Sequence, residues 1–220
     1  MIFNKIGQKA YRVGLLTCGI MSVAGCVKQP TKYDLIVNEI NALIPQRPVS
    51  VVADYRTGDC RGYYSTSSHQ VVIEGGVRAN GPDTIVHEMG HAVFRVLTHF
   101  DPRTGRSQDE LWRKIYAFSL TANNFELVRD SRYRGELKIC YGRIERNKIG
   151  HPWENESELF ASSFMVYRQY PDEFVEKITA REASRENRAF GRLVFVYLRD
   201  KVFNGRTFSK TDPFKHDKID

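Results

Sequence analysis

The most constraining feature of this 220-residue chain is a pair of histidines inside an apolar helical pattern. Residues 82–99 have a helical period, and Pro82 can begin it because a missing N–H is harmless in the first turn. His87 and His91 are spaced i and i+4, so both imidazoles lie on one face of this helix. Apolar residues flank the pair on both sides. The pattern therefore predicts a half-buried helix whose histidines face a cleft.

This spacing lets two imidazoles bind a single Zn²⁺ ion. Glu88 lies on the flank of the same face, where its carboxylate can take a proton from a water molecule instead of binding the metal. Gly90 costs a helix about 1 kcal/mol relative to alanine, and the close approach of a neighbouring element would explain it. The alternative is an ordinary pair of histidines on a helix surface.

A catalytic zinc needs a third protein ligand and an open position for water. The strongest candidate segment is 155–164, which reads NESELFASSF. If Asn155 caps a helix here, Glu158 falls at its third position, on a face that continues through small residues. Glu158 could also serve only as a capping-box partner of Asn155. Two other carboxylates compete for the ligand role, Glu154 and Glu156.

HEMGHAVF followed by NESELFASSF resembles the gluzincin zinc metallopeptidases, within them the group related to anthrax lethal factor. The resemblance covers about residues 63–170. It implies an α+β, zincin-like domain in which a small mixed or antiparallel sheet packs on the histidine helix, followed by a mostly helical C-terminal half. It also implies peptide-bond hydrolysis with Zn²⁺ as cofactor. The implied residues are His87, His91 and Glu158 as metal ligands and Glu88 as general base.

Enzymes of this group also carry a tyrosine or histidine that stabilises the oxyanion, seven residues before the third ligand. That position holds His151 here, with Tyr141 as the competing donor and a solvated loop histidine as the other interpretation. Ser162 stands where the family often has an acid that orients a zinc-bound histidine, so it would accept only a weaker hydrogen bond. Strand 69–74 is expected to line the cleft as an exposed edge that a substrate peptide could extend, or else to be a buried strand.

The remaining periodicities predict one catalytic domain over 34–205 and a flexible polar tail over 206–220. The charged stretch 129–153 reads as irregular. Further helices are expected at 34–44, 108–127, 155–169, 172–179 and 182–203, and strands at 49–55 and 63–64, the latter forming a hairpin with 69–74.

The first twenty-five residues have the layout of a secretory signal, with basic residues before an uncharged run over 13–25. As a helix this run reaches roughly 20 Å, short of the roughly 30 Å core of a bilayer. The end of the run, Val23-Ala24-Gly25-Cys26, resembles the bacterial lipobox, with a plain signal peptide as the alternative. The resemblance implies cleavage before Cys26, lipidation of its thiol and a tether over 26–33.

Such a protein would be exported and anchored to the bacterial envelope, at the periplasmic side of the outer membrane in a Gram-negative cell because Val27 follows the cysteine. Export permits a disulfide between Cys60 and Cys140, although two separate buried thiols are equally compatible with the sequence. The chain has 33 Lys and Arg against 26 Asp and Glu, a net charge of +7. Three of these charges lie in the signal, so nucleic acid is not an expected partner.

The expected partners are a peptide or protein substrate and, through the lipid, a membrane; a monomer is assumed. Two rival functions remain at this stage. One is a non-catalytic lipoprotein that binds an envelope partner, although such a protein has no use for Glu88. The other is a zinc amidase or peptidase acting on peptidoglycan peptides.

Overall fold

The computed structural model describes residues 31–54, 62–75, 77–121, 136–139, 142–145, 154–181 and 184–219. These residues form an α+β chain with a three-stranded mixed sheet and mostly helical content, as the sequence predicts. The elements in chain order are α1 (Lys32–Asn41), β1 (Ser50–Asp54), β2 (Gly62–Ser65), β3 (Gln70–Glu74), α2 (Val77–Leu97), α3 (Glu110–Thr121), β4 (Glu136–Ile139), β5 (Gly142–Glu145), α5 (Glu156–Gln169), α6 (Pro171–Thr179) and α7 (Arg185–Tyr197).

The sheet has the strand order β1-β3-β2. β2 and β3 form the predicted antiparallel hairpin, and β1 pairs in parallel with the other side of β3. β3 is therefore central, and Val71, Val72 and Ile73 are buried. Of the two interpretations of 69–74, the structure has the buried strand and not the exposed edge, because β1 covers that side; among the described strands β2 is an edge.

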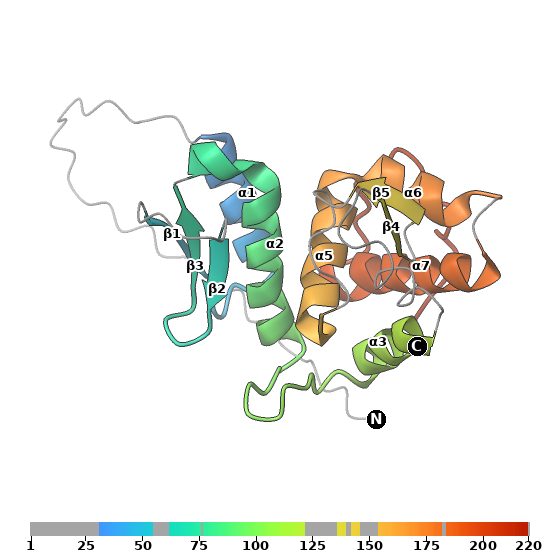
Figure 1. The fold of residues 1–220 in the computed structure, drawn as a ribbon, viewed down its shortest axis with the longest axis horizontal. Helices are drawn as coiled ribbons and strands as arrows, with labels where there is room; N and C mark the ends of the chain where they lie inside the picture. Colours follow the sequence, from blue (N-terminus) through green and yellow to red (C-terminus); the bar gives the residue numbers. More distant parts are fainter. Residues whose placement is uncertain are drawn as a thin grey trace, which may run out of the picture.

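Helix α2 separates the two halves of the fold (Figure 1). The sheet and α1 lie on one side of it, and α5, α6 and α7 lie on the other. Gly81 has φ 71° and interrupts the helix, so the segment that carries the histidines begins at Pro82 as predicted. The residues that α2 buries in the core are Ile85, Val86, Met89, Ala92, Val93 and Phe94.

Helix α1 begins at Lys32, two residues earlier than predicted, so it includes the last two residues of the expected tether. Thr31 caps it: its hydroxyl accepts from the N–H of Asp34 at 3.2 Å, while the Asp34 carboxylate accepts from the N–H of Thr31 at 2.7 Å. This reciprocal capping box satisfies two backbone donors at once and starts the helix at Lys32.

Helix α5 is the most deeply buried helix of the C-terminal half, with every residue from Leu159 to Tyr167 inside the core. Asn155 caps it as predicted, accepting from the N–H of Glu158 at 3.0 Å. α7 packs nearby and continues as a π-helical turn, Leu198–Val202. The aromatic rings that fill this half include Trp112, Phe160, Phe164, Tyr167, Phe174, Phe190, Phe195 and Tyr197.

The C-terminal residues 206–219 pack against the domain and do not form the flexible tail that the sequence predicts. Arg199 is only 5% exposed and needs acceptors for its guanidinium. Its Nη1 atom donates to the Asp212 carboxylate at 3.1 Å and to the carbonyl of Phe214 at 2.6 Å, and Nη2 donates to the carbonyl of Asp217 at 2.6 Å. Residues 206–219 therefore supply hydrogen-bond acceptors to the buried guanidinium of Arg199.

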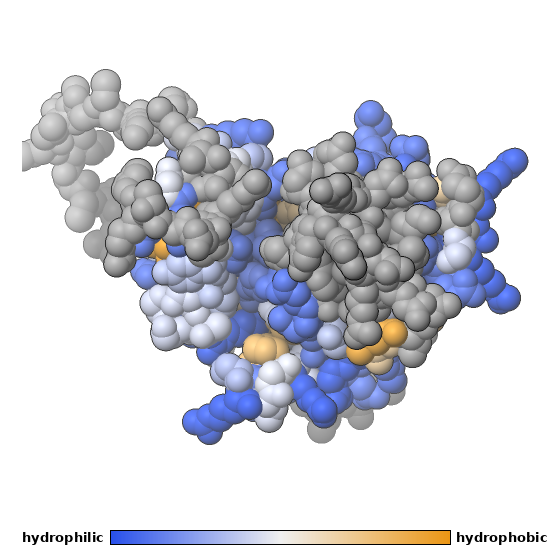
Figure 2. Space-filling model, viewed as in Figure 1, coloured by the Kyte–Doolittle hydropathy of each residue, from blue (hydrophilic) through white to orange (hydrophobic). Residues whose placement is uncertain are grey.

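Residues 129–153, predicted to be irregular, contain a short antiparallel pair of strands, β4 with β5. In the described part of the face seen in Figure 1, hydrophilic side chains predominate and apolar residues form only small separate spots (Figure 2). No helix within the described ranges has the length and apolar character needed to cross a bilayer.

The predicted signal (residues 1–25), Cys26, Cys60 and Cys140 lie outside the described residues.

Candidate metal centre

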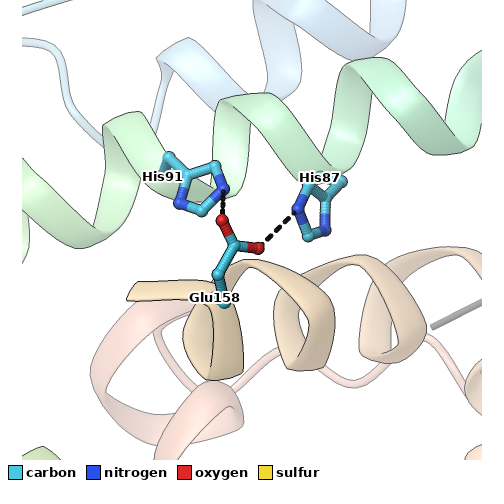
Figure 3. A group of neighbouring side chains, drawn as sticks. All are labelled: His87, His91 and Glu158. Atoms are coloured by element: carbon cyan, nitrogen blue, oxygen red, sulfur yellow. Dashed lines mark hydrogen bonds and ion pairs between the residues drawn. The ribbon is translucent and has the colours of Figure 1, made fainter. Parts of the chain in front are cut away.

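Two helices that are distant in sequence build this site. α2 carries His87 and His91, and the first turn of α5 carries Glu158 opposite them (Figure 3). The helices can approach because Gly90 has no side chain where they meet. A Cβ atom on Gly90 would lie 2.9 Å from the Cα atom of Ala161, which is the close approach that the sequence indicated.

The three side chains converge on one point. Nε2 of His87 lies 3.2 Å from Oε2 of Glu158, and Nε2 of His91 lies 3.3 Å from Oε1 of the same carboxylate. Their potential ligand atoms all lie within 4.8 Å of one another, and this is the one such group among the described residues. Side chains of these types at these distances form a triad that could hold a metal ion.

The site favours a charged carboxylate at Glu158. Burial acts to raise its pKa, but hydrogen bonds from His87 and His91 and their charge outweigh this effect and hold the pKa well below its ordinary value. The Glu158 side chain is 19% exposed, so the carboxylate is partly shielded from water. An ionised carboxylate beside two imidazoles is the protonation state that metal binding requires of this residue.

Glu88 lies on the flank of the triad, outside the group of potential ligands. Burial raises its pKa to about 7, and the Glu158 charge adds to this, while the nearby His87 and the backbone N–H of Tyr64 in β2 act in the opposite direction. This N–H donates a hydrogen bond to the Glu88 carboxyl group. Glu88 thus spans from the histidine helix to the edge strand.

The second nitrogen of each imidazole has a different environment. Nδ1 of His91 lies 2.8 Å from Oγ of Ser157. Nδ1 of His87 is buried and has no hydrogen-bond partner among the described residues, and the same is true of Oγ of Ser162. Ser162, expected to accept a weak bond from a ligand histidine, therefore makes none there, and Ser157 is a contact that the sequence analysis missed.

The structure brings His87, His91 and Glu158 together and places the competing carboxylates elsewhere. Glu156 is buried on another side of α5, where its Oε2 atom accepts from the N–H of Ser107 at 3.3 Å. Burial raises the pKa of Glu156. Glu154 is exposed just before the helix.

Glu158 does not close a capping box with Asn155, since both its carboxylate oxygens face the histidines. The two candidate oxyanion donors, His151 and Tyr141, lie outside the described residues.

No family model, curated protein or solved structure matches this chain. The chemistry of the described residues is therefore the basis on which a function can be assigned.

Proposed function

We propose that this protein is a zinc-dependent peptidase. The observation that carries the proposal is the triad of His87, His91 and Glu158 with Glu88 beside it. A purely structural metal site has no need of a carboxyl group on its flank that does not bind the metal. This combination supports the metallopeptidase resemblance of the two sequence motifs and a zincin-like arrangement of the α+β fold.

The donor set suits zinc better than a hard cation. Two imidazole nitrogens and one carboxylate form a ligand set of catalytic zinc sites, which leave a further position open. Each Nε2 atom faces a different oxygen of the Glu158 carboxylate, at 3.2 and 3.3 Å, so one carboxylate lies within reach of both imidazoles.

A bound zinc ion would supply Lewis-acid activation of a water molecule and of the scissile carbonyl group. Glu88 then acts as the general base, taking the proton of the attacking water and passing it to the leaving amine. The Tyr64 N–H holds the Glu88 carboxyl group in one orientation during this transfer. His151 or Tyr141 is proposed to donate a hydrogen bond to the oxyanion.

The proposed location rests on the N-terminal sequence. A basic segment, an uncharged run and the lipobox-like residues ending at Cys26 support export and lipid anchoring to a bacterial envelope. Peptides or proteins exposed in that compartment are the proposed substrates.

Metal analysis of the purified full-length chain, together with cleavage of a peptide library, tests the proposal. We expect about one zinc ion per chain and cleavage that stops when a chelator removes it. Glu88→Gln should keep the metal and lose cleavage, while the control Glu176→Gln, at an exposed position of α6, should keep both. Cleavage by Glu88→Gln at the wild-type rate would overturn the mechanism. Hydrolysis of purified peptidoglycan but of no peptide in the library would replace the peptidase by an amidase.

A further inference from the structure

Three serines on helix α5 have hydroxyl groups in three different situations. Ser157 contacts Nδ1 of His91 at 2.8 Å. Ser163 donates back to the carbonyl of Leu159 at 2.6 Å, within its own helix. Ser162 is fully buried and its hydroxyl has no partner among the described residues. Among these contacts of the described residues, that of Ser157 reaches a member of the triad.

The Ser157 contact separates the roles of the two nitrogens of His91. Nε2 faces the Glu158 carboxylate at 3.3 Å, and Nδ1 faces the serine on the opposite side of the ring. A neutral imidazole that uses Nε2 as a ligand carries its proton on Nδ1, and an oxygen acceptor there fixes both the tautomer and the ring orientation. With Nε2 bound to a metal, Oγ of Ser157 is the oxygen placed to accept from Nδ1.

The helix start makes this contact rigid. Ser157 and Glu158 are consecutive residues in the first turn of α5, and the Asn155 side chain anchors that turn through the N–H of Glu158 at 3.0 Å. The same turn therefore presents a ligand to the metal position and an orienting hydroxyl to a second ligand. A displacement of this turn would disturb both groups together.

Within the described ranges, His87 has no equivalent support. Its Nδ1 atom is buried and meets no donor or acceptor among the described residues. The two histidines are thus held differently, although they belong to the same helix and face the same carboxylate.

We propose that Ser157 is a positioning residue that holds His91 in the tautomer and orientation needed to bind a metal through Nε2. The inference rests on the proposed function, because it takes the triad to be a metal site. Loss of such an outer contact typically weakens metal binding by about 10- to 100-fold, and a neutral hydroxyl belongs at the lower end of this range.

The test compares Ser157→Ala with the matched control Ser163→Ala in the full-length chain. Each change removes one hydroxyl group from the same helix, and denaturant unfolding of the metal-free proteins measures how far each change alters stability. Zn²⁺ and Co²⁺ dissociation constants are measured by competition with a chromophoric chelator. We expect Ser157→Ala to bind both ions about 10-fold more weakly, Ser163→Ala to match the wild type, and Ser157→Thr, which keeps a hydroxyl, to recover most of the affinity.

Equal metal affinities in Ser157→Ala and the wild type would overturn the role of Ser157 and leave the peptidase proposal intact. Equal weakening by Ser157→Ala and Ser163→Ala would also overturn it, because a general effect on α5 would then be the cause. A wild-type chain that binds neither ion would refute the proposed function itself, and this outcome is separate because it is read without any variant.

Discussion

The Cα atom of Ala161 occupies the space that a side chain on Gly90 would need, with 2.9 Å between it and the position of a glycine Cβ. This contact sets the separation of α2 and α5, on which the two histidines and Glu158 meet. In an isolated helix, Gly90→Ala would stabilise by about 1 kcal/mol. Here we expect a loss of about 1–3 kcal/mol in the free energy of unfolding, since backbone atoms of α5 must move.

The same change should weaken zinc binding, because α5 would carry Glu158 away from the histidines. Denaturant unfolding and chelator competition measure the two effects. A Gly90→Ala protein that is more stable than the wild type and binds zinc equally well would show that the helices are not in contact at this point.

Neighbouring acidic residues on α5 should differ sharply in their effect on metal binding. Glu158→Gln keeps the shape of the side chain but removes the charge that faces both imidazoles, so we expect zinc affinity to fall by more than about 100-fold. Glu156→Gln alters a buried carboxyl that accepts from the Ser107 N–H, away from the triad, and should leave zinc affinity unchanged. Titration of the metal-free proteins with zinc checks both. A large loss in the Glu156 variant alone would reassign the third ligand.

Glu88 should make the stability of the metal-free protein depend on pH. Burial raises its pKa from 4.5 to about 7 in the folded state. Below about pH 4.5 the group is protonated in both states and has no effect. Between about pH 4.5 and 7 only the unfolded chain loses the proton, so the free energy of unfolding falls as pH rises, and above pH 7 the full cost remains.

Glu88→Gln removes this cost and keeps an oxygen that can accept from the Tyr64 N–H. We expect the metal-free variant to exceed the wild type in stability by on the order of 2 kcal/mol at pH 8, with a much smaller difference at pH 5. Urea unfolding in a chelator at both pH values measures it. An identical difference at the two pH values would mean that titration of Glu88 is not responsible.

Two arginines near the C-terminus provide another contrast. Arg199 is buried and bonds to the Asp212 carboxylate and to two carbonyls of the C-terminal segment. Arg192 has a side chain that is 54% exposed and pairs with Asp217 at 2.8 Å. We expect Arg199→Ala to cost about 2–4 kcal/mol and to open residues 206–219 to proteolysis, and Arg192→Ala to cost less than about 1 kcal/mol. Resistance of the Arg199 variant to C-terminal proteolysis would contradict the anchoring role.

Local patterns in the sequence were sufficient for the helices and the hairpin. The period of residues 82–99, the Asn155 cap and the antiparallel pairing of β2 with β3 all depend on neighbours in the chain. The parallel pairing of β1 with β3 joins strands that are not consecutive, and no short-range pattern encodes it. This is why local patterns left open whether β3 is an exposed edge or a buried strand, and the structure has it at the centre of the sheet.

The contact of Ser157 with His91 depends on how α5 is rotated against α2. Sequence spacing placed Glu158 correctly opposite the histidines, but it does not tell which neighbour reaches Nδ1 of the ring. The prediction of a flexible tail over 206–220 failed for a related reason, since contacts with the folded domain are not visible in the local sequence. The polar composition of this segment predicted exposure to solvent, whereas the buried guanidinium of Arg199 donates to its backbone carbonyls.

His87 and Glu158 are 71 residues apart in the chain, and the sheet side and the helical side of the molecule meet between them. An ion bound by both would act as a removable cross-link that closes this long loop. For loops of this size, chain entropy gives a covalent cross-link about 4 kcal/mol of stabilisation. Because closure would depend on an ion and not on a covalent bond, the free energy of unfolding would rise with the zinc concentration of its compartment.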